Sequence, residues 1–495
     1  MDQDTRPEHF DVLIIGAGIS GIDAGYHLQR NRSDSRFAIL ETKGNIGGTW
    51  HTHRFPGIRS DSDLFTFGFK WKPWLGVPIA TAEEIMKYLT DAVAEHDLEP
   101  HIRFNHLVKQ AHWNSAENQW RLVVRSDQGL ETITCRFLWM CAGYYRHDQG
   151  YMPDFPGRHD FEGPVVHPQQ WPEDLEIADK SVVVIGSGAT AATLIPALAK
   201  TAANVTMLQR SPTYFIPRPQ SDEFTQTLRA LKLPDDQFHD IMRRRNLHES
   251  EQLRIRTLEN PETVAAELIE GARAYLGEEY DVETHFTPKY RPWEQRIALV
   301  PDGDFFQAIA SGKANVVTGH IERFTKQGIA LIDGTTLTAD IIVSATGLLL
   351  NALGDIDFEI DGVPLELNQS ITHRGIMFSD IPNLVNVFGY LRSSWTLRAD
   401  LVSDYVCRLL DHMETIGAGA VTPRLRPDDL TMTTRPWIDS ENFSAGYIKR
   451  RLHLLPQQGD REPWIMTQDY FKDRVSLPAA DFEDGTLEFS NNHRN

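Results

Sequence analysis

The sequence predicts an α/β fold with two Rossmann-like dinucleotide-binding domains and a helical insertion. Two glycine-rich segments support this prediction, one beginning at Gly16 and the other at Gly186. Each follows a short apolar run and opens a stretch rich in Ile or Ala, which is the strand–turn–helix order of a nucleotide-binding βαβ unit. A further apolar run follows each segment at the distance of the next parallel strand. A single such motif also occurs by chance in tight turns, but this shared context makes both motifs specific.

The first motif is followed by an acid. Residues 16–21 read Gly-Ala-Gly-Ile-Ser-Gly, and Glu41 ends the next apolar run. An acid about 20 residues beyond the glycines can hydrogen-bond to ribose hydroxyls, which favours an unphosphorylated nucleotide. We expect FAD here, on a tight turn whose glycines let the backbone approach the pyrophosphate. The residues predicted to bind it are Gly16, Gly18, Ser20, Gly21 and Glu41.

The second motif is followed by a base. Residues 186–191 read Gly-Ser-Gly-Ala-Thr-Ala, and the apolar run 205–208 ends in Gln209 and Arg210. A guanidinium in place of the ribose-binding acid favours a 2′-phosphate, so the second nucleotide is expected to be NADPH. The residues predicted to bind it are Gly186, Gly188, Ala189, Thr190 and Arg210.

Composition indicates a large globular enzyme. The chain has 495 residues, of which 41% are hydrophobic, and a formal net charge of −20. This negative charge argues against nucleic acid as a partner, because proteins bind phosphate backbones with clustered Lys and Arg side chains. The run Arg243 to Arg245 is the one basic cluster, and we expect it on a solvated helix face.

Cysteine usage and the absence of long apolar runs favour the cytoplasm. The only cysteines are Cys135, Cys141 and Cys407, with no CxxC pair, so neither a dithiol relay nor a metal site is predicted. Residues 1–9 contain no apolar leader, and no run is long enough to span a membrane.

The pattern along the chain predicts an inserted domain. Strand-like runs occupy residues 102–108, 120–124 and 131–140, and the segment Thr81 to Glu84 reads as a capping box ahead of a helix. The strand ending in Cys141-Ala142-Gly143 resembles the later strand ending in Ala345-Thr346-Gly347. We therefore expect an FAD domain formed by residues 1–143 and 347–495, and an NADPH domain formed by residues 144–346.

A charged stretch at about residues 220–285 interrupts the second domain. Its apolar residues stand at helical spacing, so it is predicted to be a helical insertion. These residues are Phe224, Leu228, Leu231, Leu253, Leu258 and Val264.

A third motif lies between the two expected domains and resembles the fingerprint of a known family. Its residues are Phe161, Gly163, His167, Trp171 and Pro172. The spacing FxGxxxHxxxWP resembles that of class B flavoprotein monooxygenases, and the Trp-Pro ending is that of the Baeyer–Villiger type. The segments 47–50, 54–63, 292–296, 301–304 and 394–397 are most similar to the ethionamide-activating branch. The resemblance covers nearly the whole chain and is weakest at 220–285 and after about 430.

The resemblance implies a reaction. Enzymes of this type use NADPH to reduce FAD, and the reduced flavin traps O₂ as a C4a-peroxide that inserts oxygen next to a ketone carbonyl. The implied products are esters or lactones, with sulfide oxidation as a side activity. The implied partners are therefore a small ketone or sulfide and O₂.

The resemblance also implies roles for individual residues. Arg296 matches the cation beside the flavin that stabilises negative charge, and Asp61 matches the acid that orients it and contacts FAD. Further implied contacts are Thr49 and Trp50 for FAD, Gln295 for NADPH and Trp395 for the substrate pocket. His167 is expected to be a hinge residue more than a general acid.

Each role has a structural alternative. Arg296 could be a surface ion-pair residue, Asp61 could cap a turn, and Trp50 and Trp395 could simply belong to the core.

Three alternative functions remain open at this point. The same scaffold suits an S- or N-oxygenating flavin monooxygenase. A non-catalytic flavoprotein that senses NADPH or O₂ is a more remote alternative. A disulfide reductase is disfavoured because no redox cysteine pair exists.

Overall fold

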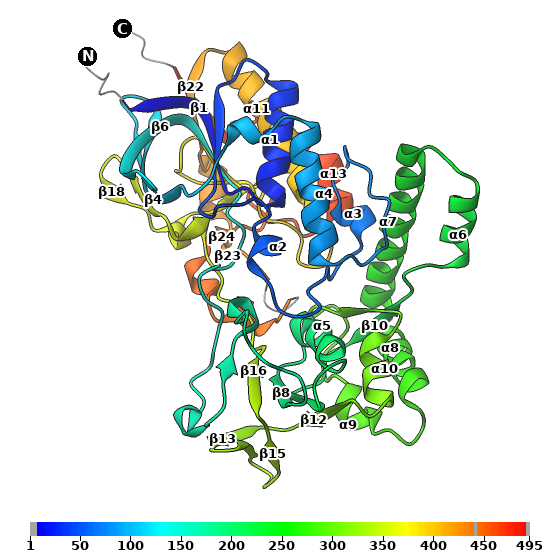
Figure 1. Ribbon diagram of the computed structural model, residues 1–495. Coiled ribbons are helices and arrows are strands. Elements are labelled where there is room, and N and C mark those ends of the chain that lie inside the picture. The colour runs from blue at the N-terminus through cyan, green and yellow to red at the C-terminus, as the bar shows by residue number, and fades with distance from the viewer. Residues whose placement is uncertain (1–6, 440–442, 492–495) are drawn as a thin grey trace.

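Two β-sheets organise the protein (Figure 1). The computed structural model describes residues 7–439 and 443–491. The first sheet lies in the upper part of the view and the second in the lower part, and a group of helices projects at the right. The fold is α/β, as the sequence predicts.

The first sheet has nine strands in the order β18-β17-β4-β5-β6-β1-β2-β3, with β21 also paired to β6. Strands β1, β2, β3 and β21 are parallel to their neighbours, whereas β4, β5 and β6 form an antiparallel meander. Their bounds are β1 (Glu8–Ile15), β2 (Phe37–Leu40), β3 (Ile102–Arg103), β4 (Leu107–Asn114), β5 (Gln119–Ser126), β6 (Gly129–Met140), β17 (Asp357–Ile360), β18 (Val363–Pro364) and β21 (Leu384–Asn386).

The expected single strand at 102–108 is wrong. Asn105 has a φ of 58°, in the left-handed region that breaks an extended run, and its turn separates β3 from β4. Sequence periodicity does not register such a local break because Asn resembles other polar residues in a half-buried strand.

The second sheet has five parallel strands in the order β12-β9-β8-β16-β7. Their bounds are β7 (Val165–Val166), β8 (Ser181–Ile185), β9 (Asn204–Gln209), β12 (Ala314–Thr318) and β16 (Ile341–Ser344). All five come from the middle of the chain, whereas the first sheet takes strands from before and after it. This division supports the proposed domains, 1–143 with 347–495 and 144–346. Residues 1–6, 440–442 and 492–495 of that division lie outside the described residues.

The two connections between the sheets run side by side. Arg146 N donates to Leu349 O at 2.8 Å, and Tyr151 N donates to Gly347 O at 3.0 Å. The outgoing and returning chains are therefore held together by backbone hydrogen bonds at the point where they leave each sheet.

Helices cover both sheets. Those outside the insertion are α1 (Ile19–Asn31), α2 (Thr49–Thr52), α3 (Leu64–Phe67), α4 (Ala82–Glu95), α5 (Ala189–Leu198), α10 (Asp304–Ala310), α11 (Thr396–Thr415), α12 (Gly446–Lys449) and α13 (Tyr470–Ser476). The capping box predicted for α4 is confirmed, because Glu84 N donates to Thr81 Oγ1 at 3.3 Å and Thr81 N donates to Glu84 Oε2 at 2.8 Å.

The stretch at 220–285 forms helices, and those in its N-terminal part project at the right of Figure 1. They are α6 (Glu223–Ala230), α7 (Asp235–Glu259), α8 (Pro261–Leu276) and α9 (Val282–Phe286). Leu228 and Val264 are buried, but Phe224, Leu231 and Leu258 are exposed. The apolar positions that define the helical period are thus only partly covered.

The expectation that the whole run 243–245 faces solvent is wrong for Arg243. This side chain is only 7% exposed, and its Nη1 donates to the carbonyl oxygens of Phe65, Thr66 and Gly68 at the end of α3. The last carbonyls of a helix lack intrahelical partners, so a guanidinium is favoured there. Arg243 thereby ties α7 to the first sheet's helices.

Short strand pairs and a three-stranded sheet complete the fold. They are β10 (Phe215–Arg218) with β11 (Ala298–Pro301), β13 (Ile321–Thr325) with β14 (Gly328–Leu331) and β15 (Thr336–Thr338), β19 (Thr372–His373) with β20 (Met377–Phe378), β22 (Ala418–Pro423) with β25 (Leu487–Asn491), and β23 (Arg435–Pro436) with β24 (Gln457–Gln458).

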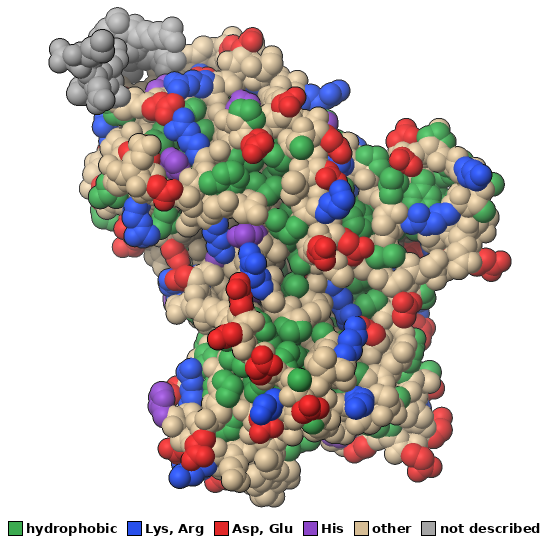
Figure 2. All heavy atoms as spheres, viewed as in Figure 1, with side chains coloured by type: hydrophobic (Ala, Val, Ile, Leu, Met, Phe, Trp, Pro, Cys, Tyr) green, Lys and Arg blue, Asp and Glu red, His purple; other side chains and the backbone are tan. Residues whose placement is uncertain are grey.

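The visible surface carries charges of both signs. Asp and Glu side chains are interspersed with Lys and Arg on the face in Figure 2. Within residues 7–439 and 443–491, no helix is both long and apolar enough to cross a bilayer.

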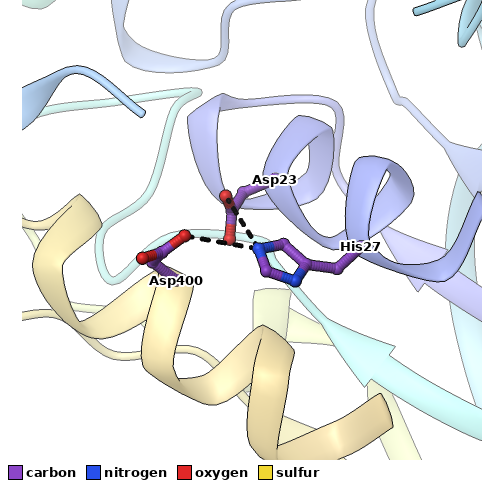
Figure 3. Close-up of side chains that lie close together, drawn as sticks. All are labelled: Asp23, His27 and Asp400. Atoms are coloured by element: carbon purple, nitrogen blue, oxygen red, sulfur yellow. Dashed lines mark hydrogen bonds and ion pairs between the residues drawn. The ribbon is translucent and has the colours of Figure 1, made fainter. Parts of the chain in front are cut away.

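A buried charged cluster joins α1 to α11 (Figure 3). Asp23 accepts hydrogen bonds from Trp71 Nε1 at 3.0 Å and from Ser403 Oγ at 2.7 Å. His27 Nε2 lies 3.8 Å from Asp23 Oδ1 and 3.3 Å from Asp400 Oδ1. Burial raises the pKa of Asp23 to about 6, although His27 opposes this shift. Both carboxylate oxygens of Asp23 already accept protein donors, so we interpret the cluster as an ionic link between helices.

The raised pKa of Asp23 predicts a specific pH dependence. The folded chain binds the Asp23 proton more tightly than the unfolded chain, so this group's stabilisation is lost as pH rises from about 4 to about 6. The free energy of unfolding of the wild type relative to Asp23→Asn should therefore fall across this window in denaturant titrations. The exposed pair-forming Asp91, changed to Asn, serves as the control. A constant wild-type-to-variant difference would contradict the prediction.

Candidate active site

One cavity of about 1170 Å³ lies between the two sheets. Its walls include the turns that follow β1, β6, β8, β9 and β16. These turns stand at the carboxyl ends of parallel strands, where ligands bind in open α/β sheets. Both predicted glycine motifs therefore face the same space.

The first motif is closely packed at Gly16 and Gly21. A Cβ at Gly21 would lie 1.8 Å from the Gly16 carbonyl oxygen, so the helix can approach the turn only if this position is glycine. Gly16, Gly18 and Ser20 line the cavity. The Ser20 hydroxyl accepts a hydrogen bond from Trp395 Nε1 at 2.8 Å, which fixes the indole against the motif.

Glu41 is held in place by backbone amides. Its Oε2 accepts from Ala17 N at 2.8 Å and its Oε1 accepts from Lys43 N at 2.9 Å. Burial raises the pKa of this carboxyl, while the two amides favour its charged form. Glu41 also lines the cavity, and a carboxylate there can accept hydrogen bonds from ribose hydroxyls.

The second motif faces open space. A Cβ at Gly188 would meet no atom of the described residues within 4 Å. The first amides of α5 lie directly after this glycine, and such amides with the positive end of the helix dipole suit a phosphate. Gly186, Ala189, Thr190 and Arg210 line the same part of the cavity.

Arg296 and Asp61 come together at the centre of the cavity wall. Arg296 Nη2 donates to Asp61 Oδ1 at 2.9 Å, and Nε lies 2.6 Å from Asp61 Oδ2. Arg296 Nη1 donates to the Leu391 carbonyl oxygen at 3.0 Å. The guanidinium is therefore held by an acid and a carbonyl, and its side chain keeps 27% exposure toward the cavity.

The surroundings keep Arg296 charged. Burial alone would lower its pKa, but Asp61 and the hydroxyls of Tyr144 and Tyr447 raise it above the ordinary value. Tyr144 and Tyr447 share a hydrogen bond and both line the cavity. A fixed positive charge thus stands beside two hydroxyl groups.

Aromatic side chains form the rest of this wall. Trp395 is stacked on Tyr144 with ring centroids 5.2 Å apart, and Trp50 packs edge-on against Phe67. Thr49 Oγ1 lies 2.6 Å from the Tyr145 hydroxyl. Both tryptophans line the cavity and also pack against the core, and their proposed contacts with FAD and substrate stay predictions.

Gln295 lines the cavity next to Arg296. The fingerprint residues lie elsewhere. Two separate hydrophobic clusters pack on the second sheet: Phe161 is buried in one of them, and Trp171 packs against the other. Phe161, Gly163, His167, Trp171 and Pro172 do not belong to the lining of this cavity.

His167 instead joins the two inter-sheet connections. Its Nε2 lies 3.1 Å from Gly347 O, and its Nδ1 accepts from Gln169 N at 3.2 Å. Burial lowers its pKa, so the ring is neutral at pH 7 and uses both nitrogens for structural hydrogen bonds. This position favours the hinge interpretation over direct proton transfer.

Sequence reasoning missed Tyr144, Tyr145, Tyr447 and Arg450 as cavity residues. The two tyrosines after Gly143 had a usable signal, because they follow a parallel strand at its carboxyl end. Tyr447 and Arg450 had none, since they come from the segment where the family resemblance was weakest.

Comparisons with known proteins fit this geometry. Residues 78–242 match a family described as Flavin-binding monooxygenase-like, and residues 14–74 match an NAD(P)-binding Rossmann-like domain. The chain is 44% identical over 485 residues to the FAD-containing monooxygenase EthA of Mycobacterium tuberculosis, covering 98% of each protein.

The chain belongs to the family of FAD-containing monooxygenases. The resemblance inferred from the sequence is thus confirmed, and the disulfide reductase alternative is excluded. Two solved structures share the fold of this monooxygenase. OTEMO in complex with FAD and NADP matches with a TM-score of 0.75 at 20% identity, covering 98% of this chain and 100% of that one. Cyclohexanone monooxygenase bound to ε-caprolactone matches with a TM-score of 0.73 at 19% identity and the same coverage.

The position of His167 in this monooxygenase generates a prediction. His167→Ala removes the side-chain link to Gly347, so we expect slower oxygenation or more hydrogen peroxide release per NADPH while FAD stays bound. The exposed His159 of the same segment, changed to Ala, is the control. Flavin absorbance measures FAD content and a peroxide assay measures uncoupling. Loss of FAD from His167→Ala would indicate a purely structural residue.

Proposed function

We propose that this monooxygenase uses NADPH and O₂ to insert one oxygen atom next to a ketone carbonyl, giving an ester or lactone. Oxidation of sulfides is proposed as a side activity. The observation that carries this proposal is the guanidinium of Arg296, which Asp61 and Leu391 hold in the wall of the cavity that both glycine motifs face. A preorganised cation suits a reaction in which negative charge develops on a carbonyl oxygen.

The two cofactors are assigned to the two ends of the cavity. The relative EthA is named as FAD-containing, and the OTEMO structure is described as a complex with FAD and NADP. We propose that the first glycine motif, Glu41, Thr49 and Trp50 hold FAD, and that the second motif, Arg210 and Gln295 hold NADPH. FAD supplies the chemistry that activates O₂, which no protein side chain can provide.

Arg296 has two proposed tasks in the cavity. Its charge stabilises anionic oxygen near the flavin position and polarises the carbonyl oxygen of a bound ketone. Asp61 is a positioning residue, because its carboxylate fixes the plane of the guanidinium through Nε and Nη2. Arg296 is not proposed to transfer a proton to the ketone, because its raised pKa keeps the guanidinium charged throughout the reaction.

The aromatic side chains of the cavity wall also have a proposed task. Trp50, Trp395 and the stacked Tyr144 present apolar surface where the ketone would lie, and they limit the access of water to the reacting atoms. Tyr144 and Tyr447 add hydroxyl groups to the same cavity lining, and both influence Arg296. This combination of apolar walls and few polar groups is typical of small-molecule sites.

Oxygenation of sulfur or nitrogen is the second candidate function. This reaction is also compatible with membership in the family of FAD-containing monooxygenases. It depends less on a cation than attack on a carbonyl does. The pairing of Arg296 with Asp61 favours the ketone reaction. A non-catalytic sensor would have no need of that pair.

We also propose a cytoplasmic location. The three cysteines are free and buried, as expected where thiols stay reduced.

Arg296 variants test the proposed reaction. Arg296→Ala should lower ester formation from ketones by about a hundredfold to a thousandfold, because one oxyanion-stabilising group is lost. NADPH oxidation should remain measurable and its electrons should appear as hydrogen peroxide. Arg296→Lys should restore activity only in part, since an ammonium lacks the planar fork that Asp61 orients.

The assay follows ester, NADPH and hydrogen peroxide together for a panel of ketones and sulfides. Near wild-type ester formation by Arg296→Ala would overturn the assignment and direct attention to Arg54 or Arg59. Sulfoxide formation without ester in the wild type would instead support the second candidate function.

A further inference from the structure

Arg450 enters the cavity from the C-terminal part of the chain. It directly follows α12, and its guanidinium carbon lies 3.6 Å from the centroid of the Tyr151 ring. Its Nη2 makes a long contact of 3.5 Å with Leu348 O, and its Nε is buried without a hydrogen-bond partner among the described residues. Tyr151 covers one face of the guanidinium, but stacking leaves the N–H groups at its edge free to donate.

The charge around Arg450 sets it apart from other arginines of the cavity. Arg59 pairs with Asp304, Arg146 with Asp148, and Arg296 with Asp61. In the part of the chain that the structure describes, neither Arg450 nor Arg210 forms an ion pair with an acid. This is unexpected in a protein with 69 Asp and Glu against 49 Lys and Arg.

The charge of Arg210 also acts on Arg450. Burial lowers the pKa of Arg450, and the charge of Arg210 lowers it further. Arg450 is half-buried and Arg210 is exposed, and their like charges destabilise each other unless an anion lies between or beside them. A bound phosphate would offset this repulsion.

The two arginines reach the cavity from different parts of the fold. Arg210 follows β9 of the second sheet. Arg450 is positioned by its neighbours: Ser444 N donates to Glu294 O at 2.7 Å, and Arg451 Nη1 donates to Leu350 O at 2.8 Å. These contacts hold the segment 443–451 across the connection between the sheets, facing the second glycine motif.

We propose that Arg450 is a phosphate-binding residue of the nicotinamide dinucleotide site and holds the cofactor from the side opposite Arg210. The inference rests on the proposed use of NADPH. A guanidinium presents a planar fork of donors that matches phosphate oxygens, and the free edge of Arg450 provides such a fork. The phosphate is either the 2′-phosphate or the pyrophosphate, and the experiment distinguishes them.

The test is a binding measurement without turnover. Oxidised, FAD-loaded protein is titrated calorimetrically with NADP⁺, NAD⁺ and adenosine 2′-monophosphate. The variants are Arg450→Met, Arg450→Lys and, as control, Lys449→Met, whose exposed side chain directly precedes Arg450 and does not line the cavity. Arg210→Met provides the reference for loss of the predicted 2′-phosphate contact.

Arg450→Met should weaken NADP⁺ binding about tenfold to a hundredfold, the usual effect of losing a charge-assisted hydrogen bond. Arg450→Lys should recover part of this loss, and Lys449→Met should change NADP⁺ affinity by less than about twofold, within the range of surface substitutions. If NAD⁺ binding is unchanged and adenosine 2′-monophosphate binding is weakened, the contact is to the 2′-phosphate. If NADP⁺ and NAD⁺ weaken alike, it is to the pyrophosphate.

Unchanged NADP⁺ affinity in Arg450→Met, or an equal loss in Lys449→Met, would overturn the inference. A wild type that binds NAD⁺ as well as NADP⁺, with both weakened in Arg450→Met, would contradict the proposed NADPH preference but support the role of Arg450. A wild type that binds neither dinucleotide would contradict both proposals.

Discussion

A guanidinium held in the wall of a cavity between two sheets needs a fixed negative partner, because an isolated charge is costly to remove even partly from water. Arg296 meets this requirement with Asp61 and with the carbonyl of Leu391, which belong to the first sheet's side of the molecule. Arg296 itself lies in the segment inserted between the strands of that sheet. The ion pair therefore links both parts of the chain at the place where the cavity needs a cation, so the site exists only when the two parts are packed together.

The same dependence explains the positions of the other cavity residues. Glu41 and the first glycine motif reach the cavity from one sheet, and Gly188 and Arg210 reach it from the other. His167 lies outside the cavity, on the paired connections that set how the sheets meet. We infer that the fingerprint acts on the reaction through domain placement, while Arg296 acts on the reacting atoms directly. Arg450 extends this arrangement by bringing a second cation from the C-terminal segment toward the dinucleotide end.

Local signals in the sequence predicted the parts of the fold that local geometry determines. The glycine motifs and the Thr81 capping box depend on residues that are neighbours in the chain, so the sequence alone predicts them. Asp61 and Arg296 are 235 residues apart, and only the family resemblance suggested their pairing. Arg243 was misassigned because its partners, the carbonyls at the end of α3, also lie far away in the sequence, with Phe65 178 residues before it. Tyr447 and Arg450 depend likewise on tertiary packing, which no local pattern encodes.

A double-mutant cycle between Asp61 and Arg296 tests the central claim most directly. The kcat/KM for ester formation is measured for the wild type, Asp61→Asn, Arg296→Gln and the double variant, all loaded with FAD. If Asp61 acts by holding Arg296, the double variant should be no slower than Arg296→Gln, with a coupling energy of about 1 to 3 kcal/mol. If the two losses simply multiply, the residues act independently, and the ion pair is not the basis of the site.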